Sequence, residues 1–260
     1  MNLSTGMAHA ADLPMPRARV ARAYLQEVRS ECLRYLRNPG FLLPTLLFPT
    51  VFYLMFRVLL NRGGGDHTAR YLLAAYTTFG VIAPGLFGFG VSVALERDGG
   101  LLTFKRALPM PPAAYFVGKM AMAMLMAGVI VSLLLLLATQ LAQVRLDAGQ
   151  MVRLYATGML GVLPFCALGL LVGTLVKGQG APALINLLYL PMAFLSGLWF
   201  PLKGGLLAAA PAWPSFHLNQ LALSALGLPH AGSTLDHVAV LCACMIACLW
   251  LAARRLRRHG

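Results

Sequence analysis

Charged residues are scarce in this sequence. Of 260 residues only 11% are Asp, Glu, Lys or Arg, while 59% are apolar and the mean hydropathy is +0.73. A soluble domain carries about 25% charged residues, so this composition excludes a water-soluble globular protein. Among the charged residues, the acidic ones are in the minority: the sequence has eight Asp and Glu and 21 Lys and Arg, which gives a formal net charge of +13.

Motifs for nucleotide hydrolysis and for common hydrolases are also absent. Gly118-Lys119 is followed by Met120, and the phosphate-binding pattern GxxxxGK[ST] does not occur. Neither GxSxG nor HExxH is present. We therefore expect no catalytic site on this chain, and we expect any work that it performs to draw on energy from another chain.

The five cysteines predict neither a disulfide framework nor a metal site. Four of them lie in apolar runs, where small buried packing is their usual role. His237, Cys244 and Cys248 fall near one helical face and could in principle hold a soft metal ion. No fourth ligand is evident beside them, so packing remains the favoured interpretation and no metal is expected.

What the sequence does contain is six uncharged, mainly apolar runs, each long enough for a membrane-crossing helix of about 20 residues. They predict an all-α integral membrane protein. The expected spans are about 40–60, 71–95, 115–142, 153–176, 180–200 and 236–253. We expect 1–16 to be a disordered N-terminal tail and 17–260 to form one membrane domain.

The basic residues flank these runs, and they predict the orientation. With a cytoplasmic N-terminus, 15 of the 21 Lys and Arg residues, Lys119 among them, fall in inner segments, as the positive-inside rule requires. Both termini are then cytoplasmic and the number of crossings is even. Because the charges do not form a stripe interleaved with stacking aromatics, we expect a lipid bilayer as partner and no nucleic acid.

Two segments outside the six spans have a predicted shape. The stretch 17–37 is amphipathic and is expected to lie in the cytoplasmic interface as an elbow helix, where lipid anchoring and partner contact are both open. The stretch 204–235 is uncharged, but Pro211, Pro214 and Pro229 interrupt it too often for a continuous span. We expect a broken, re-entrant element in the outer half of the membrane.

The loop between the second and third spans has the form of a short helix. Gly99 and Gly100 break the span, and about two turns of helix then run until Pro109. Leu101, Phe104 and Leu108 fall on one face, with Lys105 and Arg106 pointing away from it. Such a helix suits a groove on a partner, although a solvated, positively charged loop is an equally good interpretation of the residues alone.

Two stretches resemble a known family. The run ERDGGLLTFKRALPMPPAAYFVGK (96–119) resembles the cytoplasmic coupling segment of type 2 ATP-binding-cassette (ABC) transporter permeases. The run LPMAFLSGLWFPLKGGLLAAAPAW (190–213) is similar to that family's Pro-x-x-x-x-Ser-Gly-x-x-Phe-Pro at the outer end of the fifth span. Both fall where the predicted topology needs them.

The resemblance implies the role of each site residue. The segment implied to couple to an ATPase subunit comprises Glu96, Arg97, Asp98, Gly99, Gly100, Leu101, Phe104, Lys105, Arg106, Leu108 and Pro109. The implied outer re-entrant motif comprises Pro191, Ser196, Gly197, Phe200 and Pro201.

The resemblance also implies the partners and the activity. It implies a permease half of an exporter in the bacterial inner membrane, paired with an identical or related second half and with two ATP-binding subunits. ATP and magnesium would bind to those subunits, and this chain would bind no cofactor. Most members export drugs, lipids or polysaccharide precursors. The competing interpretation is a membrane scaffold, or a membrane-embedded enzyme, without ATP coupling.

Small and aromatic residues suggest how the spans pack and where a substrate passes. Gly169 and Gly173 form a GxxxG pattern on the fourth span, and 85–90 in the second is glycine-rich, so we expect close helix contacts there. Phe48, Phe52 and Phe56 share a face of the first span. They could line a translocation route for a hydrophobic or amphipathic substrate, or they could face lipid.

Overall fold

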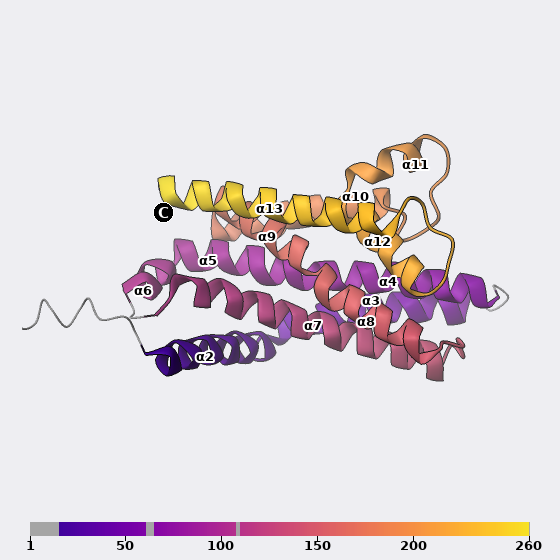
Figure 1. Ribbon diagram of the computed structural model, residues 1–260, viewed down its shortest axis with the longest axis horizontal. Coiled ribbons are helices and arrows are strands. Elements are labelled where there is room, and N and C mark those ends of the chain that lie inside the picture. The colour runs from indigo at the N-terminus through magenta and orange to yellow at the C-terminus, as the bar shows by residue number, and fades with distance from the viewer. Residues whose placement is uncertain (1–15, 61–64, 108–109, 260) are drawn as a thin grey trace, which may run out of the picture.

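A computed structural model describes residues 16–60, 65–107 and 110–259, and over those ranges the chain is helical without a strand. The elements form an elongated bundle (Figure 1). In chain order they are α2 Arg17–Leu36, α3 Pro39–Leu54, η1 Met55–Leu60, α4 Asp66–Ala83, η2 Pro84–Val91, α5 Ser92–Asp98, α6 Leu101–Ala107, α7 Pro112–Gln140, α8 Ala148–Gly161, α9 Leu163–Leu175, η3 Gly178–Gly180, α10 Ala181–Leu195, α11 Gly205–Ala209, η4 Ala210–Ala212, α12 Pro214–Ala225 and α13 Thr234–His259. The predicted tail 1–16 lies outside the described residues except for Pro16.

Within the ranges that the structure describes, five helices are long and apolar enough to cross a membrane, which confirms the prediction of a helical membrane protein. They are Pro39–Arg57, Asp66–Asp98, Ala113–Gln140, Ala148–Leu175 and Thr234–Leu256. The second joins α4, η2 and α5 into one rod, and η2 has wider π-helical turns that begin at Pro84, where the backbone lacks a donor. The fourth joins α8 and α9.

The predicted span 180–200 is shorter in the structure. Helix α10 has 15 residues, which at 1.5 Å per residue gives about 22 Å, less than the hydrocarbon core of a typical bilayer. It ends at Leu195 because Ser196 leaves the helix and Gly197 takes a φ of +74°, a left-handed conformation that glycine adopts without strain.

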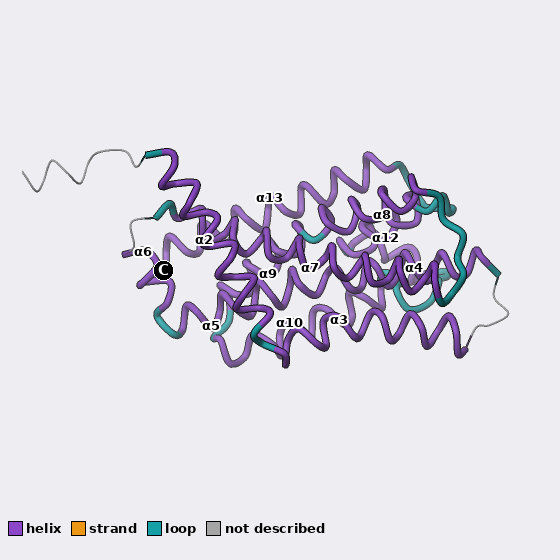
Figure 2. The backbone as a smooth tube through the Cα atoms, turned by 90° about the horizontal axis from the view of Figure 1, so that it is seen from below, coloured by secondary structure: helices purple, strands orange, loops and turns teal. Residues whose placement is uncertain are grey.

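The two ends of the bundle differ in what they carry. Helix α6, the elbow helix α2 and the C-terminus lie at one end, which we call the α6 end (Figure 1). Helix α11 and the beginnings of α12 and α13 lie at the opposite end. Loops cluster at the two ends and the long helices run between them (Figure 2).

The broken element predicted for 204–235 is present as α11, η4 and α12, but α12 is not at the periphery. It packs against α4, α8 and α13, and most of its side chains are buried. The protein core therefore surrounds α12, whereas the residues of α11 are exposed. Non-helical backbone at membrane depth is tolerated only where protein or a water-filled cavity covers it.

The closest helix contact joins α9 to η2 through glycine, as the sequence predicted. A Cβ atom on Gly169 would lie 2.7 Å from the carbonyl oxygen of Gly85, and one on Gly173 would lie 2.6 Å from that of Gly90. No real Cβ contact is that short with backbone. The absence of side chains at these four positions sets the spacing of the second and fourth long helices.

Replacing Gly173 with Val should therefore separate α9 from η2. We expect a loss of about 1–3 kcal/mol in stability from overpacking, seen as a lower midpoint of thermal unfolding followed by fluorescence-detected size exclusion in detergent. The matched control is Gly205→Ala on α11, where an added Cβ meets no atom within 4 Å. Equal midpoints for the two variants would contradict this account of the contact.

Candidate functional site

A fully buried lysine forms the centre of the α6 end. Lys119 of α7 is 0% exposed, and its ammonium group lies 3.0 Å from Glu31 Oε2, 2.8 Å from Glu96 Oε1 and 3.0 Å from Ser92 Oγ. In the sequence, Lys119 counts with the charges that flank the spans. The structure corrects this placement, because a buried charge is tolerated when carboxylates and hydrogen bonds satisfy it.

Around Lys119 lies a neutral group of charges, which we call the charged cluster. It comprises three carboxylates and three cations: Glu27, Glu31, Glu96, Arg34, Lys105 and Lys119. Tyr115 donates a hydrogen bond of 2.6 Å to Glu96 Oε2. Arg34 binds both Glu31 and Glu96, and Lys105 binds Glu27.

The electrostatics keep Arg34 charged. Burial by itself lowers the pKa of its guanidinium, but the carboxylates of Glu31 and Glu96 more than offset this and raise the pKa above the ordinary arginine value. Arg34 therefore stays charged and holds the two carboxylates together while they are ionised. Helix α2 and the end of the second long helix are thereby joined by an ionic contact.

The charged cluster connects four separate elements. Helix α2 supplies three members, α5 supplies Glu96, α6 supplies Lys105 and α7 supplies Lys119. The ammonium of Lys105 also lies 4.7 Å from the centre of the Tyr115 ring, within cation–π range. A displacement of α6 would therefore act directly on α2 and on the beginning of α7, the third long helix.

The other two residues of the predicted Glu96-Arg97-Asp98 opening bind elsewhere. The Arg97 guanidinium donates to the carbonyl oxygens of Thr174 and Val176, at 2.9 and 2.6 Å, and so satisfies acceptors at the end of α9. Asp98 Oδ2 accepts a hydrogen bond of 2.6 Å from the amide of Gly178. The triplet therefore joins the end of α5 to the turn between α9 and α10 as well as to the charged cluster.

The glycine break behaves as the sequence predicted. The amide of Gly99 donates to Leu95 O at 2.9 Å and completes the last turn of α5, and Gly100 has a φ of +74°. The seven-residue helix α6 follows at once. Only a residue without Cβ takes that conformation at little cost, so Gly100 sets the direction in which α6 leaves the bundle.

Helix α6 presents one apolar side chain outward. Phe104 is 62% exposed, Leu101 is half-buried, and Leu102 packs against the core. Lys105 turns toward the bundle, away from Phe104's open side, to reach Glu27. Of the other residues predicted for this segment, Leu108, Pro109 and the side chain of Arg106 lie outside the described part of the chain.

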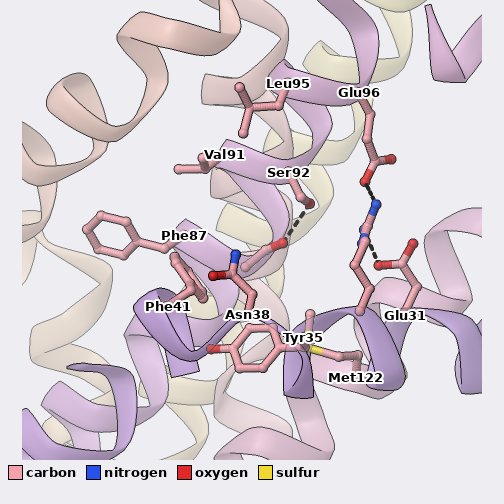
Figure 3. Close-up of a pocket in the computed structure, with 12 residues that line it drawn as sticks. Glu31, Tyr35, Asn38, Phe41, Phe87, Val91, Ser92, Leu95, Glu96 and Met122 are labelled. Carbon is pink, nitrogen blue, oxygen red and sulfur yellow. Dashed lines mark hydrogen bonds and ion pairs between the residues drawn. The ribbon is translucent and has the colours of Figure 1, made fainter. Parts of the chain in front are cut away.

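A cleft of about 200 Å³ opens beside the charged cluster (Figure 3). Glu31, Glu96 and Arg34 line its polar side, and Arg34 is bonded to both carboxylates. Phe41, Phe87 and other apolar side chains line the rest. The cleft therefore offers an amphipathic wall between the elbow helix and the second long helix.

A continuous strip of aromatic rings leads from this cleft toward the opposite end. We call it the aromatic strip, and it comprises Tyr35, Phe41, Phe87, Tyr189, Phe79 and Trp199. Successive ring centres lie 5.0 to 6.3 Å apart, so each ring touches the next. The strip was not evident from the sequence, because its rings come from five different elements and from the loop after α10.

The three phenylalanines singled out on the first span lie beside this strip. Phe48 and Phe52 are exposed on α3, with their ring centres 6.2 Å apart, and Phe56 stacks on Tyr76 at 6.0 Å. Tyr76 in turn contacts Phe79 of the strip. The shared face that the four-residue spacing predicts is therefore present, and it continues into the interior.

The outer motif is organised around the end of α10. Ser196 and Ser215 share a hydrogen bond, Ser215 also donates to Met192 O at 3.1 Å, and Tyr71 donates to Gly197 O at 2.7 Å. These bonds fix α12 and α4 to the turn. Pro191 lies inside α10, while Phe200 and Pro201 follow the turn and are exposed.

Glu27, Glu31, Arg34 and Tyr115 belong to this site, although the sequence did not predict them there. The amphipathic pattern of 17–37 predicts an apolar buried face on α2, yet Leu25 and Leu36 are exposed, and the buried residues are Glu27, Glu31 and Tyr35. A signal was available: two rare acidic residues stand four apart on a helix that is otherwise basic, which places them on one face.

Comparisons with known proteins agree on one family. A family model described as ABC-2 type transporter matches residues 23–213, which includes the charged cluster and the outer motif. A relative from Bacillus subtilis (strain 168), described as "Putative transport permease YvfS", is 27% identical over 196 residues, covering 74% of this chain and 80% of the relative.

Proposed function

The chain belongs to the ABC-2 type transporter family and is a multi-pass membrane permease; from this premise we propose that it is the transmembrane subunit of an ATP-driven exporter. On this proposal it has no ATPase site of its own. Two separate ATP-binding subunits carry ATP and magnesium, and their closure moves the permease.

The observation that carries this proposal is the way α6 is attached. Its exposed Phe104 gives a partner an apolar contact, and the neighbouring Lys105 ties the same helix to the charged cluster. Arg97 and Asp98, just before the glycine break, bind the turn between α9 and α10. A push on α6 is therefore passed to α2, α7 and α10 through bonds rather than through a flexible loop.

We further propose six crossings with both termini in the cytoplasm of a bacterial cell. The α6 end would be cytoplasmic, because it carries α6 and the C-terminal arginines, in keeping with the positive-inside rule. The 15-residue α10 would be the fifth crossing: it begins near Asp98 at the α6 end and ends in the outer motif, where Gly197 accepts from Tyr71. Such a short helix requires local thinning of the bilayer or cover from a second permease half.

The substrate that we propose is hydrophobic or amphipathic. The charges of the charged cluster are paired with one another, so none is left to bind an ionic group across the membrane. The aromatic strip and the exposed face with Phe48 and Phe52 give apolar contact surface along most of the bundle. A second half, identical or related, would cover this face and close the route.

Purification of the intact complex tests this proposal. We expect the tagged chain, extracted in mild detergent from its own host, to bring down a subunit with a GxxxxGK[ST] motif and Mg²⁺-dependent ATPase activity. Reconstituted vesicles should then move a lipid-like or drug-like probe only when ATP is supplied. Recovery of the permease without any ATPase, or probe movement that is independent of nucleotide, would favour the scaffold or the enzyme without ATP coupling instead.

A further inference from the structure

Two buried histidines meet at the end of the bundle opposite to α6. His217 of α12 and His237 of α13 are 7% and 4% exposed, and their Nδ1 atoms lie 2.8 Å apart. This contact joins the inserted outer helix to the first turn of the last helix. Both residues lie outside 23–213, the part of the chain that the family model matches.

The other nitrogen of each ring points at a backbone carbonyl. His217 Nε2 lies 2.9 Å from the carbonyl oxygen of Pro211, and His237 Nε2 contacts that of Ala231. A carbonyl oxygen only accepts hydrogen bonds. Both Nε2 atoms must therefore carry a proton and donate it.

The three contacts need one proton more than two neutral rings possess. A neutral imidazole carries a proton on one nitrogen only, so two rings protonated at Nε2 would present bare Nδ1 lone pairs to each other at 2.8 Å. Moving one proton to Nδ1 would repair that contact but leave an Nε2 lone pair facing a carbonyl oxygen. Only a pair with three protons satisfies all three contacts.

We propose that His217 and His237 form a proton-binding site, in which an imidazolium donates from Nδ1 to the Nδ1 of its neutral neighbour. The bound proton fastens α12 to α13. A metal ion does not fit between the same atoms, because two nitrogen ligands of a tetrahedral zinc ion, each bonded at about 2.0–2.1 Å, lie about 3.3 Å apart. The 2.8 Å separation is that of an N–H···N hydrogen bond.

The surroundings supply dipoles rather than a counter-ion. The titratable groups on neighbouring elements are Asp236 and His230, both exposed, together with Asp66, Arg70 and Arg153 from α4 and α8. Arg70 pairs with Asp66, Arg153 donates to Ala225 O, and His230 contacts Leu228 O. Within the described ranges none of them is bonded to either ring, so the two carbonyl oxygens stabilise a single positive charge and not two.

The contact is therefore strongest over an intermediate range of pH. Loss of the bound proton in alkaline medium leaves two lone pairs facing each other, and gain of a second proton in acid places two like charges 2.8 Å apart. Either change weakens the hold of α12 on α13. The proposed proton-binding site follows from the positions of the two histidines alone. Its contact with the external medium depends in addition on the proposed orientation of the chain in the membrane.

Solid-state NMR of the full chain in lipid nanodiscs, with ¹⁵N-labelled histidine, tests this site without any partner subunit. In spectra recorded over a series of pH values from about 8 to about 4, we expect an Nδ1–Nδ1 coupling across a shared proton within an intermediate range and its loss at both ends. The coupling should vanish in His217→Gln and His237→Gln and persist in His230→Gln, the matched control from the adjoining loop.

The wild-type spectrum alone can overturn the proposal, so it does not depend on how the variants fold. The absence of coupling at every pH of the series would exclude a shared proton. Addition of one equivalent of Zn²⁺ should leave the coupled signals unchanged, and their movement would identify a metal site instead. Failure of the exporter proposal would leave all of these results as they stand.

Discussion

Replacing Lys119 with Met should destabilise the permease more than any other single change at the α6 end. The substitution removes the cation that pairs with both Glu31 and Glu96 and leaves these carboxylates in an apolar interior with one partner fewer. Breaking a buried ion pair in this way costs about 3–5 kcal/mol. For a chain of this size, we expect the midpoint of thermal unfolding to fall by on the order of 10 °C.

Lys177→Met is the matched control for this prediction. Lys177 lies at the same end of the bundle but is exposed, so its loss should change the midpoint by no more than a surface substitution does. A double-variant cycle with Glu96→Gln adds a second test, because residues in direct contact should show a coupling energy of about 0.5–3 kcal/mol. Equal midpoints for the two Lys→Met variants would show that the charged cluster does not hold the helices together.

Replacing Phe104 with Asp should abolish transport while leaving the protein folded. Phe104 is exposed, so a charge there costs the isolated permease little stability, within about 0.5 kcal/mol. In the proposed complex, the same charge would be buried at the contact with the ATPase subunit and would have no opposite charge to pair with. The loss of binding free energy should then be about 2 kcal/mol or more, as for an interface hot spot. We expect at least a tenfold loss of ATPase subunit bound to the permease, and ATP-driven transport should fall with it.

Two further variants separate loss of contact from loss of fold. Phe104→Leu keeps an apolar side chain on α6 and should retain most of the binding. Leu207→Asp places the same charge on an exposed apolar residue of α11 at the opposite end, and it should leave subunit binding unchanged. Full ATPase binding and full transport in Phe104→Asp would remove the coupling role from this residue.

The helices and their approximate bounds could be predicted from the sequence with few errors. An uninterrupted apolar run in a bilayer forms a helix, because every backbone group must be hydrogen-bonded within the segment. The glycines of α9 and η2 correctly indicated a close helix contact, since the lack of a side chain allows two backbones to approach each other. The fifth span was the exception: a continuous apolar run hid the helix end at Leu195, which the turn at Gly197 fixes.

The short helix after the second long helix could be predicted from its glycine break, but its attachment could not. Glu96, Arg97 and Asp98 stand together in the chain, yet the first binds α2 and α7 while the other two bind the turn after α9. Adjacent residues on a helix point in different directions, and their partners are set by the elements packed on each side. The aromatic strip was hidden for the same reason.

By itself, the sequence determined that this protein crosses a membrane, where its helices run and which family it joins, because apolar run length and local motifs are properties of the chain. Only the tertiary structure decided which charges are buried and which helices they connect. Lys119 meets Glu31 from 88 residues away and Glu96 from 23, and such a charge can enter the interior only once those partners are already in place.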